Sequence, residues 1–481
     1  MGIIKKLASQ TIVYGISSML GRFINFLLII PHTKYLDSVN AYGDITTIFA
    51  FMAFLNIILT YGMETTFFNF IRNGKSSELV FSITQKSILF STSIFILFIL
   101  LFPSFSSNFI GYPHHKEYIY ICLIFLVFDT LSVLPFARIR FEEKPLKFAL
   151  IKLVNIIINV CLNLYLLIYT PDFLSEFDQV SLILIAVAVA SFSSFILLSP
   201  LAFDIFQPFD FSLYKQMLKY AWPLIFVGFA GMINETLDRT LLKKLLPASE
   251  GSYQNGIYGA FYKLTMIMTM FVQAFRFAAE PLFFKQKESA ENRLVYAHVM
   301  YWFIGVCTFI FLGCMFFIDE LAHLFIRNSS YFEDSNGLFI VPILLLANMF
   351  LGIYYNLSIW YRFTNNTKRG ATMSIIGAIT TVLLNFIFIP KYGFVACAWI
   401  TLIVYAGMCV MSYVWGNLYY SIPYTLKKYL ILIGVSILLW SVSLFFESHF
   451  SVKWLQIVIN TSLLSLMLLI IWLLQPNRKI A

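Results

Sequence analysis

The chain has 481 residues, of which 60% are hydrophobic and 12% charged, and its mean hydropathy is +0.81. A soluble domain of ordinary composition is about half apolar and about a quarter charged. This surplus of apolar residues excludes a water-facing globule and predicts an all-α polytopic membrane protein. The six cysteines form no CxxC pair, which argues against a disulfide framework or a zinc site.

Fourteen apolar segments follow one another along the chain. Each is long enough for a helix to cross about 30 Å of hydrocarbon, and the ten-residue alternating segments of a membrane barrel are not found. The first segment follows Lys5 and Lys6 and carries Arg22 but shows no small-residue cleavage site, so we expect a retained helix and not a signal peptide. The expected spans are 11–30, 43–70, 83–103, 117–136, 148–169, 179–199, 218–246, 256–280, 296–318, 338–361, 369–390, 393–416, 428–447 and 454–474.

The lysines and arginines between these spans predict an orientation. With the N-terminus in the cytoplasm, the inner segments hold 22 of these residues and the outer segments hold seven. Cytoplasmic loops of membrane proteins carry such an excess, so we expect both termini in the cytoplasm. The net charge of +9 is therefore mostly an orientation signal, and we expect no nucleic-acid partner.

The two halves of the chain repeat one another. One set of matching residues, from Arg140 to Asn163, recurs with a shift of 222 residues from Arg362 to Asn385. Spans 1–6 and 7–12 are therefore interpreted as parallel repeats that enclose a cavity at their interface. The predicted parts are an N-terminal lobe (1–210), a C-terminal lobe (211–417) and two additional helices (418–481). The other set of matches has a shift of 216 residues: it pairs Tyr42–Gly43, Glu64 and Phe67–Phe68 with Tyr258–Gly259, Glu280 and Phe283–Phe284.

Four cations fall within the expected spans, where charge is costly and usually faces a cavity or a partner. Arg22 lies near the predicted midplane, and the repeat maps it onto Asp238, which precedes Arg239. Two interpretations stay open: a structural ion pair between Arg22 and Asp238, or a basic cavity lining for an anionic substrate. Lys263 either belongs to the same lining or extends to the outer face. The fourth cation is Arg276.

Five carboxylates also fall within the spans: Glu64, Asp129, Glu235, Asp238 and Glu280. Glu280 is expected to pair with Arg276 one turn earlier. Glu64 is placed near the C-terminal end of its helix, where the helix dipole disfavours a carboxylate, so it is expected to have a tertiary partner or to titrate. Asp129 is equally well explained as a structural partner of Arg138 or Arg140. These five residues and Arg276 are the candidates for a gate or a coupling step.

Two stretches carry a resemblance to a known family. "YLDSVNAYGDITTIFAFMAFLNIILTYGMETTFF" (Tyr35–Phe68) resembles the start of the bacterial polysaccharide flippases, the Wzx-type members of the multidrug/oligosaccharidyl-lipid/polysaccharide (MOP) exporter superfamily. "INETLDRTLLKKLLP…GIYGAFYKL" (Ile233–Leu264) is similar to a second motif of that family. The resemblance covers nearly the whole chain. It implies a V-shaped core of twelve helices, related to the multidrug and toxin extrusion (MATE) transporters, plus two C-terminal helices.

The resemblance also implies a function. Relatives move undecaprenyl-diphosphate-linked oligosaccharides across the bacterial inner membrane for O-antigen, capsule or exopolysaccharide synthesis, alongside a polymerase and other assembly proteins. Basic residues on helices 1, 7 and 8 bind the anionic head group, and here Arg22, Arg239 and Lys263 fall on those helices. Span 2 has no basic residue before Arg72, unlike the peptidoglycan-precursor flippases. No cofactor is expected, and the coupling ion, H⁺ or Na⁺, is left open.

Two alternatives remain at this point. The first is a MATE-type multidrug or organic-cation antiporter, against which Arg22 argues because such transporters hold a deep carboxylate in the N-terminal lobe. The second is a membrane enzyme such as an O-antigen polymerase or ligase. Every outer loop is about 20 residues or fewer, and no nucleophile–base pair or metal-ligand cluster is found in the sequence, so we expect no enzyme and no metal.

Overall fold

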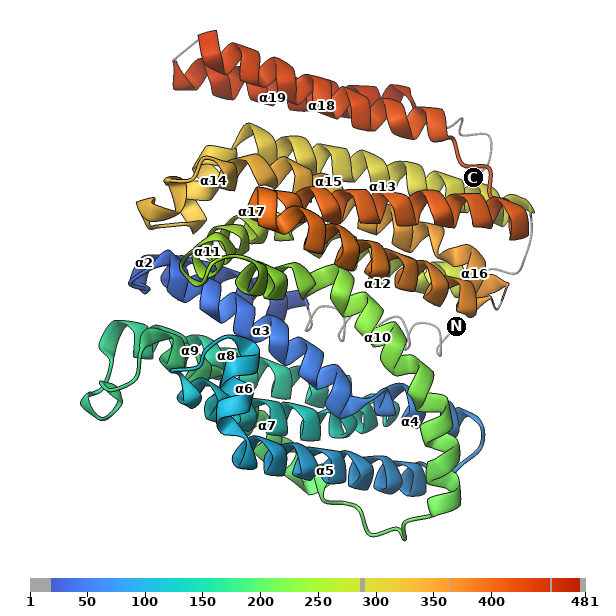
Figure 1. The fold of residues 1–481 in the computed structure, drawn as a ribbon. Helices are drawn as coiled ribbons and strands as arrows, with labels where there is room; N and C mark the ends of the chain where they lie inside the picture. The colour runs from blue at the N-terminus through green and yellow to red at the C-terminus, as the bar shows by residue number, and fades with distance from the viewer. Residues whose placement is uncertain (1–18, 286–289, 365, 450–451, 476–481) are drawn as a thin grey trace. The chain divides into compact units, whose positions relative to one another are not determined.

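The computed structural model describes residues 19–285, 290–364, 366–449 and 452–475 (Figure 1). In these ranges all regular elements are helices. The first half contains α2 (Ile29–Tyr35), α3 (Val39–Thr60), α4 (Met63–Arg72), α5 (Ser77–Leu101), α6 (Pro103–Ile110), α7 (Lys116–Phe141), α8 (Pro145–Tyr169), η1 (Asp172–Leu174), α9 (Gln179–Ala202) and α10 (Phe211–Leu245). The second half contains α11 (Ala248–Leu264), α12 (Met266–Lys285), α13 (Ala290–Phe316), α14 (Ile318–Phe325), η2 (Ser329–Phe332), α15 (Asn336–Leu357), α16 (Ile359–Phe363), α17 (Thr367–Tyr419), α18 (Leu426–His449) and α19 (Lys453–Leu473).

The prediction of an all-α multi-pass membrane protein is confirmed. Among the described residues, 11 helical stretches are long and apolar enough to cross a membrane. One of them, the 53-residue α17, contains both of the expected spans 369–390 and 393–416. Expected span 256–280 is divided between α11 and α12, and the first expected span, 11–30, is described only from residue 19 onward. The remaining expected spans each correspond to one of these stretches.

The expected boundary between spans 369–390 and 393–416 is observed as an interruption of the helical conformation at Gly393, within α17. This residue has φ +55° and ψ −140°, a conformation open only to glycine, in the middle of an otherwise helical run. A Cβ atom there would lie 2.0 Å from Oε1 of Gln254, which accepts a hydrogen bond from the Phe394 amide at 3.2 Å. The glycine therefore lets the chain change direction where a side chain from α11 occupies the space.

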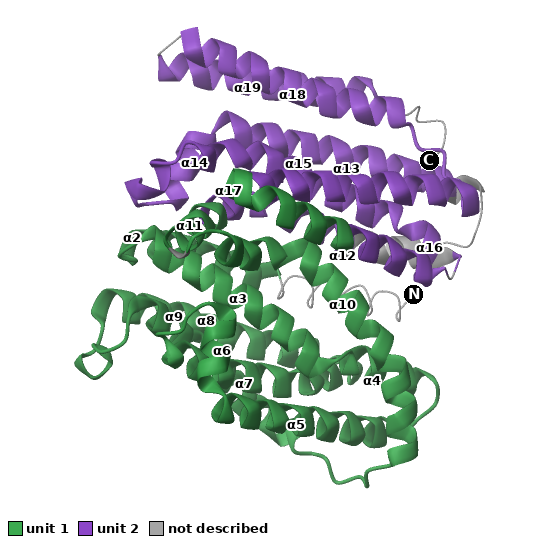
Figure 2. Ribbon diagram, in the orientation of Figure 1, with its two compact units in different colours: residues 1–259, 378–394 green, residues 260–377, 395–481 purple. Residues whose placement is uncertain are grey.

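The helices divide into two compact units (Figure 2). Unit 1 comprises residues 1–259 and 378–394, and unit 2 comprises residues 260–377 and 395–481. In unit 1, α9 packs along both α7 and α8, and α3 packs against α10. In unit 2, α13 packs against α15 and α18, and α18 packs against α19. These units follow packing and not the sequence repeat, so the two lobes and the additional helices stay a prediction.

A cluster of buried apolar side chains in unit 1 fixes the position of α4. Met63 and Phe67 of α4 are fully buried and pack with Phe81 of α5, Leu134 of α7 and Met217 of α10. The rings of Phe67 and Phe81 meet edge to face with centroids 6.1 Å apart, a favourable aromatic geometry. Within a membrane such close packing, more than escape from water, holds helices together. The short helix that carries Glu64 is thus held by three neighbours.

The helical conformation is interrupted between α3 and α4, at Tyr61 and Gly62. Both have left-handed backbone conformations, with φ values of 30° and 73°, and Gly62 precedes the first residue of α4. This corrects the expectation for Glu64, which lies in the first turn of a new helix and not near the end of the preceding one. A carboxylate in a first turn is stabilised by the helix dipole, so Glu64 is favoured where it stands.

We predict that Gly62→Ala destabilises the protein more than Gly74→Ala. Both glycines have positive φ, which costs an alanine about 1–2 kcal/mol, but Gly74 faces open space whereas a Cβ at Gly62 would lie 3.0 Å from Cβ of Leu224. Thermal unfolding of the two variants in detergent measures the difference. Equal shifts in the unfolding temperature would show that the Leu224 side chain moves away from the added methyl group at no cost in free energy.

Candidate functional site

The start of α3 and the middle of α11 touch through glycines. A Cβ atom at Gly43 would lie 1.8 Å from the carbonyl oxygen of Ser252, and one at Gly256 would lie 2.1 Å from the carbonyl oxygen of Val39. The two helix backbones are therefore in direct contact, as small residues allow in membrane proteins. Gly259 continues the contact, since a Cβ there would meet Thr46 at 2.8 Å. The segments in contact include both copies of the repeated tyrosine–glycine pair.

A polar network centred on Asp44 borders this glycine contact. The Asp44 carboxylate accepts hydrogen bonds from Ser252 Oγ at 2.5 Å and Tyr112 Oη at 2.8 Å, and it forms an ion pair with Lys243 Nζ at 3.1 Å. Lys243 also donates to Ser252. The side chains of Lys243 and Asp44 are 12% and 21% exposed, so the pair is largely removed from solvent. Burial and the adjacent carboxylate raise the pKa of Tyr112 well above its usual value, which keeps its hydroxyl a donor.

The sequence did not single out this network. In the sequence, Lys243 is one of the seven lysines and arginines of the expected outer segments, and Asp44 directly follows the repeated tyrosine–glycine pair but maps onto Ala260 in the second repeat. Asp44 and Lys243 are 199 residues apart, and neither stands in a motif with fixed spacing. The one sequence feature that could have indicated this network is the position of Asp44 directly after the repeated tyrosine–glycine pair.

Asp238 has partners other than the expected one. Its Oδ2 accepts a hydrogen bond from Tyr258 Oη at 2.5 Å, and its Oδ1 lies 4.0 Å from Nη1 of Arg239. In the part of the chain that the structure describes, Arg22 and Asp238 form no ion pair, so the interpretation of a structural lock between them is wrong for this conformation. Arg22 is exposed on the helix that precedes α2. It is therefore a cation within a predicted span that this conformation leaves accessible.

The other two cations predicted to bind substrate lie on α10 and α11. The Arg239 side chain is 14% exposed, and its Nη1 donates to the Glu235 carbonyl at 3.1 Å, while the Glu235 side chain is exposed. The Arg239 guanidinium also lies over the Tyr258 ring, 5.9 Å from the ring centroid. Lys263 is half-buried on α11 in unit 2. The joint action of these cations with Arg22 stays a prediction.

Charged residues of unit 1 form a second cluster, which joins α4, α7 and α8. Glu64 forms an ion pair with Arg140, as expected for a carboxylate that needs a tertiary partner. Asp129 accepts a hydrogen bond from Asn56 Nδ2 at 3.4 Å and attracts Lys152, which also interacts with Glu64 and is repelled by Arg140. Two cations and two anions thus share one region.

The alternative that assigned Asp129 to one of two arginines does not hold. Arg138 bonds to Glu142 at 3.0 Å and to Asp204 at 2.7 Å, whereas Arg140 bonds to Glu64. Asp129 is left with an amide donor and the more distant Lys152. Asp129 therefore has a weaker direct partner than Glu64, which is paired with Arg140.

Two expected gate residues on α12 remain without a test of their pairing. The Glu280 side chain lies outside the described residues, although its position on α12 is defined. Arg276 is exposed, and its guanidinium lies 4.9 Å from the ring centroid of Tyr355. The expected pair between Glu280 and Arg276 therefore stays a prediction.

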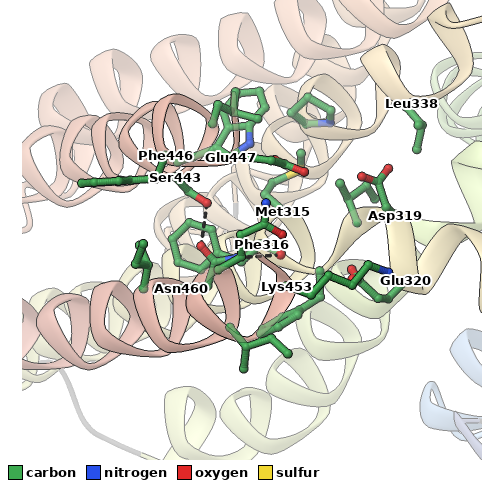
Figure 3. A pocket seen from close by; sticks show the side chains of 18 of the residues that line it. Met315, Phe316, Asp319, Glu320, Leu338, Ser443, Phe446, Glu447, Lys453 and Asn460 are labelled. Carbon is green, nitrogen blue, oxygen red and sulfur yellow. Dashed lines mark hydrogen bonds between the residues drawn. The ribbon is translucent and has the colours of Figure 1, made fainter. Parts of the chain in front are cut away.

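Unit 2 contains a cavity of about 300 Å³ with several charged residues in its wall, between α13, α14, α15, α18 and α19 (Figure 3). Asp319, Glu320 and Glu447 line it together with Lys453. Asn460 joins its walls by accepting from Ser443 Oγ at 2.6 Å and by donating to the Phe316 carbonyl at 3.0 Å. The excess of carboxylates disfavours a phosphate there, and no cluster able to hold a metal ion is found among the described residues.

One family model and several solved structures are similar to this chain. The family model described as "Polysaccharide biosynthesis protein" matches residues 7–287, more than half of the chain. The solved structure "Lipid II flippase MurJ, inward closed conformation" is similar with a TM-score of 0.71 at 16% identity, covering 95% of this chain and 98% of that one. "Inward-facing conformation of a multidrug resistance MATE family transporter of the MOP superfamily" is similar with a TM-score of 0.59 at 14% identity, covering 82% and 97%. The structure titled "Outward-facing conformation of a multidrug resistance MATE family transporter of the MOP superfamily" gives a TM-score of 0.58 at 13% identity, covering 85% and 95%. No curated protein matches significantly.

Proposed function

We propose that this chain, which belongs to the polysaccharide biosynthesis protein family, moves an undecaprenyl-diphosphate-linked oligosaccharide across the bacterial inner membrane. The observation that carries the proposal is the family match over residues 7–287. The fold supports it, because it is shared with a lipid II flippase over 95% of this chain. The exposed Arg22 on a predicted span supplies a cation for the diphosphate.

The chemistry of such a substrate fits a protein of this kind. A diphosphate joined to sugars cannot enter hydrocarbon, whereas a polyprenyl tail stays in the bilayer throughout. Transport therefore requires a polar path for the head group and alternate exposure of that path to the two faces of the membrane. An arginine binds phosphate through two parallel hydrogen bonds, and Arg22, Arg239 and Lys263 are the proposed contacts.

We infer that the other charged residues within the spans act in gating or coupling. Glu64, Asp129, Glu235, Asp238, Glu280 and Arg276 are the candidates. A conformational change needs a differential interaction with the two states, and ion pairs that exchange partners can supply it. The polymerase and other proteins that assemble the polysaccharide are proposed as partners, and both termini are proposed to lie in the cytoplasm.

A second function is favoured by one observation. Asp129 lies within a span, has no cation at ion-pair distance among the described residues and accepts a bond from Asn56 at 3.4 Å. A carboxylate so placed suits exchange of an organic cation against protons, the activity proposed for a MATE-type antiporter. The similarity to MATE structures is lower than that to the lipid II flippase, so the flippase is the first proposal.

We predict that Arg22→Ala lowers the rate of flipping by about tenfold or more. Loss of a charge-assisted contact to the head group costs about 1.5–3 kcal/mol, and each 1.4 kcal/mol is a factor of ten. The measurement uses proteoliposomes with a fluorescent undecaprenyl-diphosphate-linked oligosaccharide and an impermeant quencher that reports the outer leaflet. Arg72→Ala is the matched control, because Arg72 is also an exposed arginine but stands in the last turn of α4.

The outcomes separate the proposals. Loss of transport in Arg22→Ala, with Arg72→Ala near wild type, supports a head-group contact at Arg22. Equal rates in both variants would keep the flippase and remove Arg22 from its site. Absence of any glycolipid movement, together with efflux of an organic cation that Asp129→Asn abolishes, would replace the flippase by an antiporter.

A further inference from the structure

A second cavity, of about 670 Å³, lies within unit 1 between α3, α5, α6, α7, α10 and part of α17. Its walls are aliphatic and aromatic, with Phe51, Ile58, Leu123 and Phe229 among them. Lys244 is the only charged residue among its described lining residues, and none of these is acidic. Its size is within the range of small-molecule sites, and its composition suits a hydrocarbon chain.

The cavity follows one face of α10. Residues 229, 233, 237, 240, 241 and 244 of this helix line it, at the spacing of a helical face. The stripe extends about 22 Å at 1.5 Å per residue, somewhat more than the ~15 Å of hydrocarbon in one leaflet. Lys244 is the penultimate residue of α10, so it stands where a spanning helix leaves the hydrocarbon. The geometry places one cation at head-group level above an apolar space as long as an acyl chain.

Two polar groups of α10 are available at this cavity. Lys244 Nζ lies 4.2 Å from the ring centroid of Phe109 and 5.3 Å from that of Phe51, and the described residues give it no ion pair. Its neighbour Lys243, by contrast, is bound to Asp44. Thr240, one turn earlier, is 6% exposed, and its hydroxyl has no hydrogen-bond partner among the described atoms.

The unpaired hydroxyl of Thr240 is unusual for its position. A threonine in a helix commonly donates to the carbonyl four residues earlier, as Thr236 does to Met232 at 3.1 Å. A buried hydroxyl without a partner costs about 1–3 kcal/mol. An ester or phosphate oxygen between Thr240 and Lys244 would accept a hydrogen bond from the first and pair with the charge of the second.

We propose that this cavity binds one acidic phospholipid, with an acyl chain in the apolar space and its phosphodiester at Thr240 and Lys244. A single lysine matches a single negative charge, as on phosphatidylglycerol, whereas a diphosphate would leave charge unpaired. This site is separate from the proposed contacts of the transported head group. It does not depend on which substrate the protein moves.

The test uses the full-length protein, delipidated in detergent, and native mass spectrometry with equal amounts of dioleoyl-phosphatidylglycerol and dioleoyl-phosphatidylcholine. Wild type is expected to retain one phosphatidylglycerol with about tenfold preference. Lys244→Gln should remove the preference, Thr240→Val should lower retention about threefold to tenfold, and Thr240→Ser should restore it. Lys391→Gln, which removes an exposed lysine from α17, should leave the preference unchanged.

Several results would overturn the proposal. Equal retention of the two lipids by wild type, or an unchanged preference in Lys244→Gln, would remove the head-group contact. Displacement of phosphatidylglycerol by equimolar undecaprenyl phosphate would assign the cavity to the carrier lipid instead. Where Lys244→Gln does not fold, Lys244→Arg decides, since it keeps the charge and should retain the lipid, and a loss of preference there would contradict the site.

Discussion

Gly43→Ala is expected to abolish transport, whereas Gly407→Ala leaves it near the wild-type rate. The methyl group at position 43 would lie 1.8 Å from the Ser252 carbonyl oxygen, which belongs to a helix backbone and cannot turn away. Position 407 has nothing within 4 Å of an added Cβ atom. Overpacking of a close contact costs about 1–3 kcal/mol and sometimes more, and only position 43 incurs that cost.

The expected loss of transport follows from a shift between conformations. If α3 and α11 separate and meet once per cycle, a penalty of about 3 kcal/mol on the state in contact changes its population by a factor of about 150. Flipping assays in proteoliposomes and thermal unfolding in detergent together measure the effect. Gly256→Ala should behave like Gly43→Ala, because its methyl group would meet the Val39 carbonyl oxygen. A folded Gly43→Ala protein with normal transport would contradict the backbone contact.

Glu64→Gln is expected to destabilise the protein more than Arg140→Gln does. Removing Glu64 leaves Arg140 and Lys152 as two repelling cations with Asp129 as the remaining anion of the cluster. Removing Arg140 leaves Glu64 with Lys152 and relieves that repulsion. Breaking a buried pair costs about 3–5 kcal/mol, but Glu64 is 40% exposed, so we expect about 2 kcal/mol for Glu64→Gln and about half of that for Arg140→Gln.

The double variant and an exposed pair complete this test. Glu64→Gln with Arg140→Gln together should cost less than Glu64→Gln alone, because no cation is left without its anion. Lys144→Gln breaks a pair with Glu142 in which the lysine is 56% exposed, and it should change stability by less than about 1 kcal/mol. Unfolding in detergent measures all four. An Arg140→Gln variant less stable than Glu64→Gln would show that Lys152 does not take part in the cluster.

The sequence predicted the helices well because the membrane imposes one solution on them. A backbone in hydrocarbon must satisfy its own hydrogen bonds, so each apolar segment of sufficient length forms a helix. The break between spans 11 and 12 was also predictable, since Pro390 and Gly393 stand together in "FIPKYGF". In contrast, the break at Tyr61 and Gly62 lies in a continuous apolar run, and the packing of Gly62 against Leu224 marks it only in three dimensions.

The candidate site was less predictable because its partners are distant in sequence. Hydropathy identifies Glu64 as a charge in an apolar run, but its partner Arg140 is 76 residues away, at the end of another helix. The suggested pair of Arg22 with Asp238 was an inference from the repeat alone, and Tyr258 occupies the carboxylate instead. A repeat relates positions by symmetry and does not say which of them touch.

The contact at Gly43 and Gly256 has a consequence for the ancestry of the chain. In this contact Gly43 meets Ser252 and Gly256 meets Val39, so the two segments pair in antiparallel order. The pairing is centred near Asn40 and Gly256, which are equivalent positions of the two repeats. In a dimer of two identical half-length chains such a contact is self-complementary, and each substitution would appear on both sides at once. In this chain the counterpart of Gly256 is Asn40, so one side has glycine where the other has a polar residue. If the predicted duplication is the origin of the two halves, their union in one chain has allowed the two sides of this contact to diverge separately.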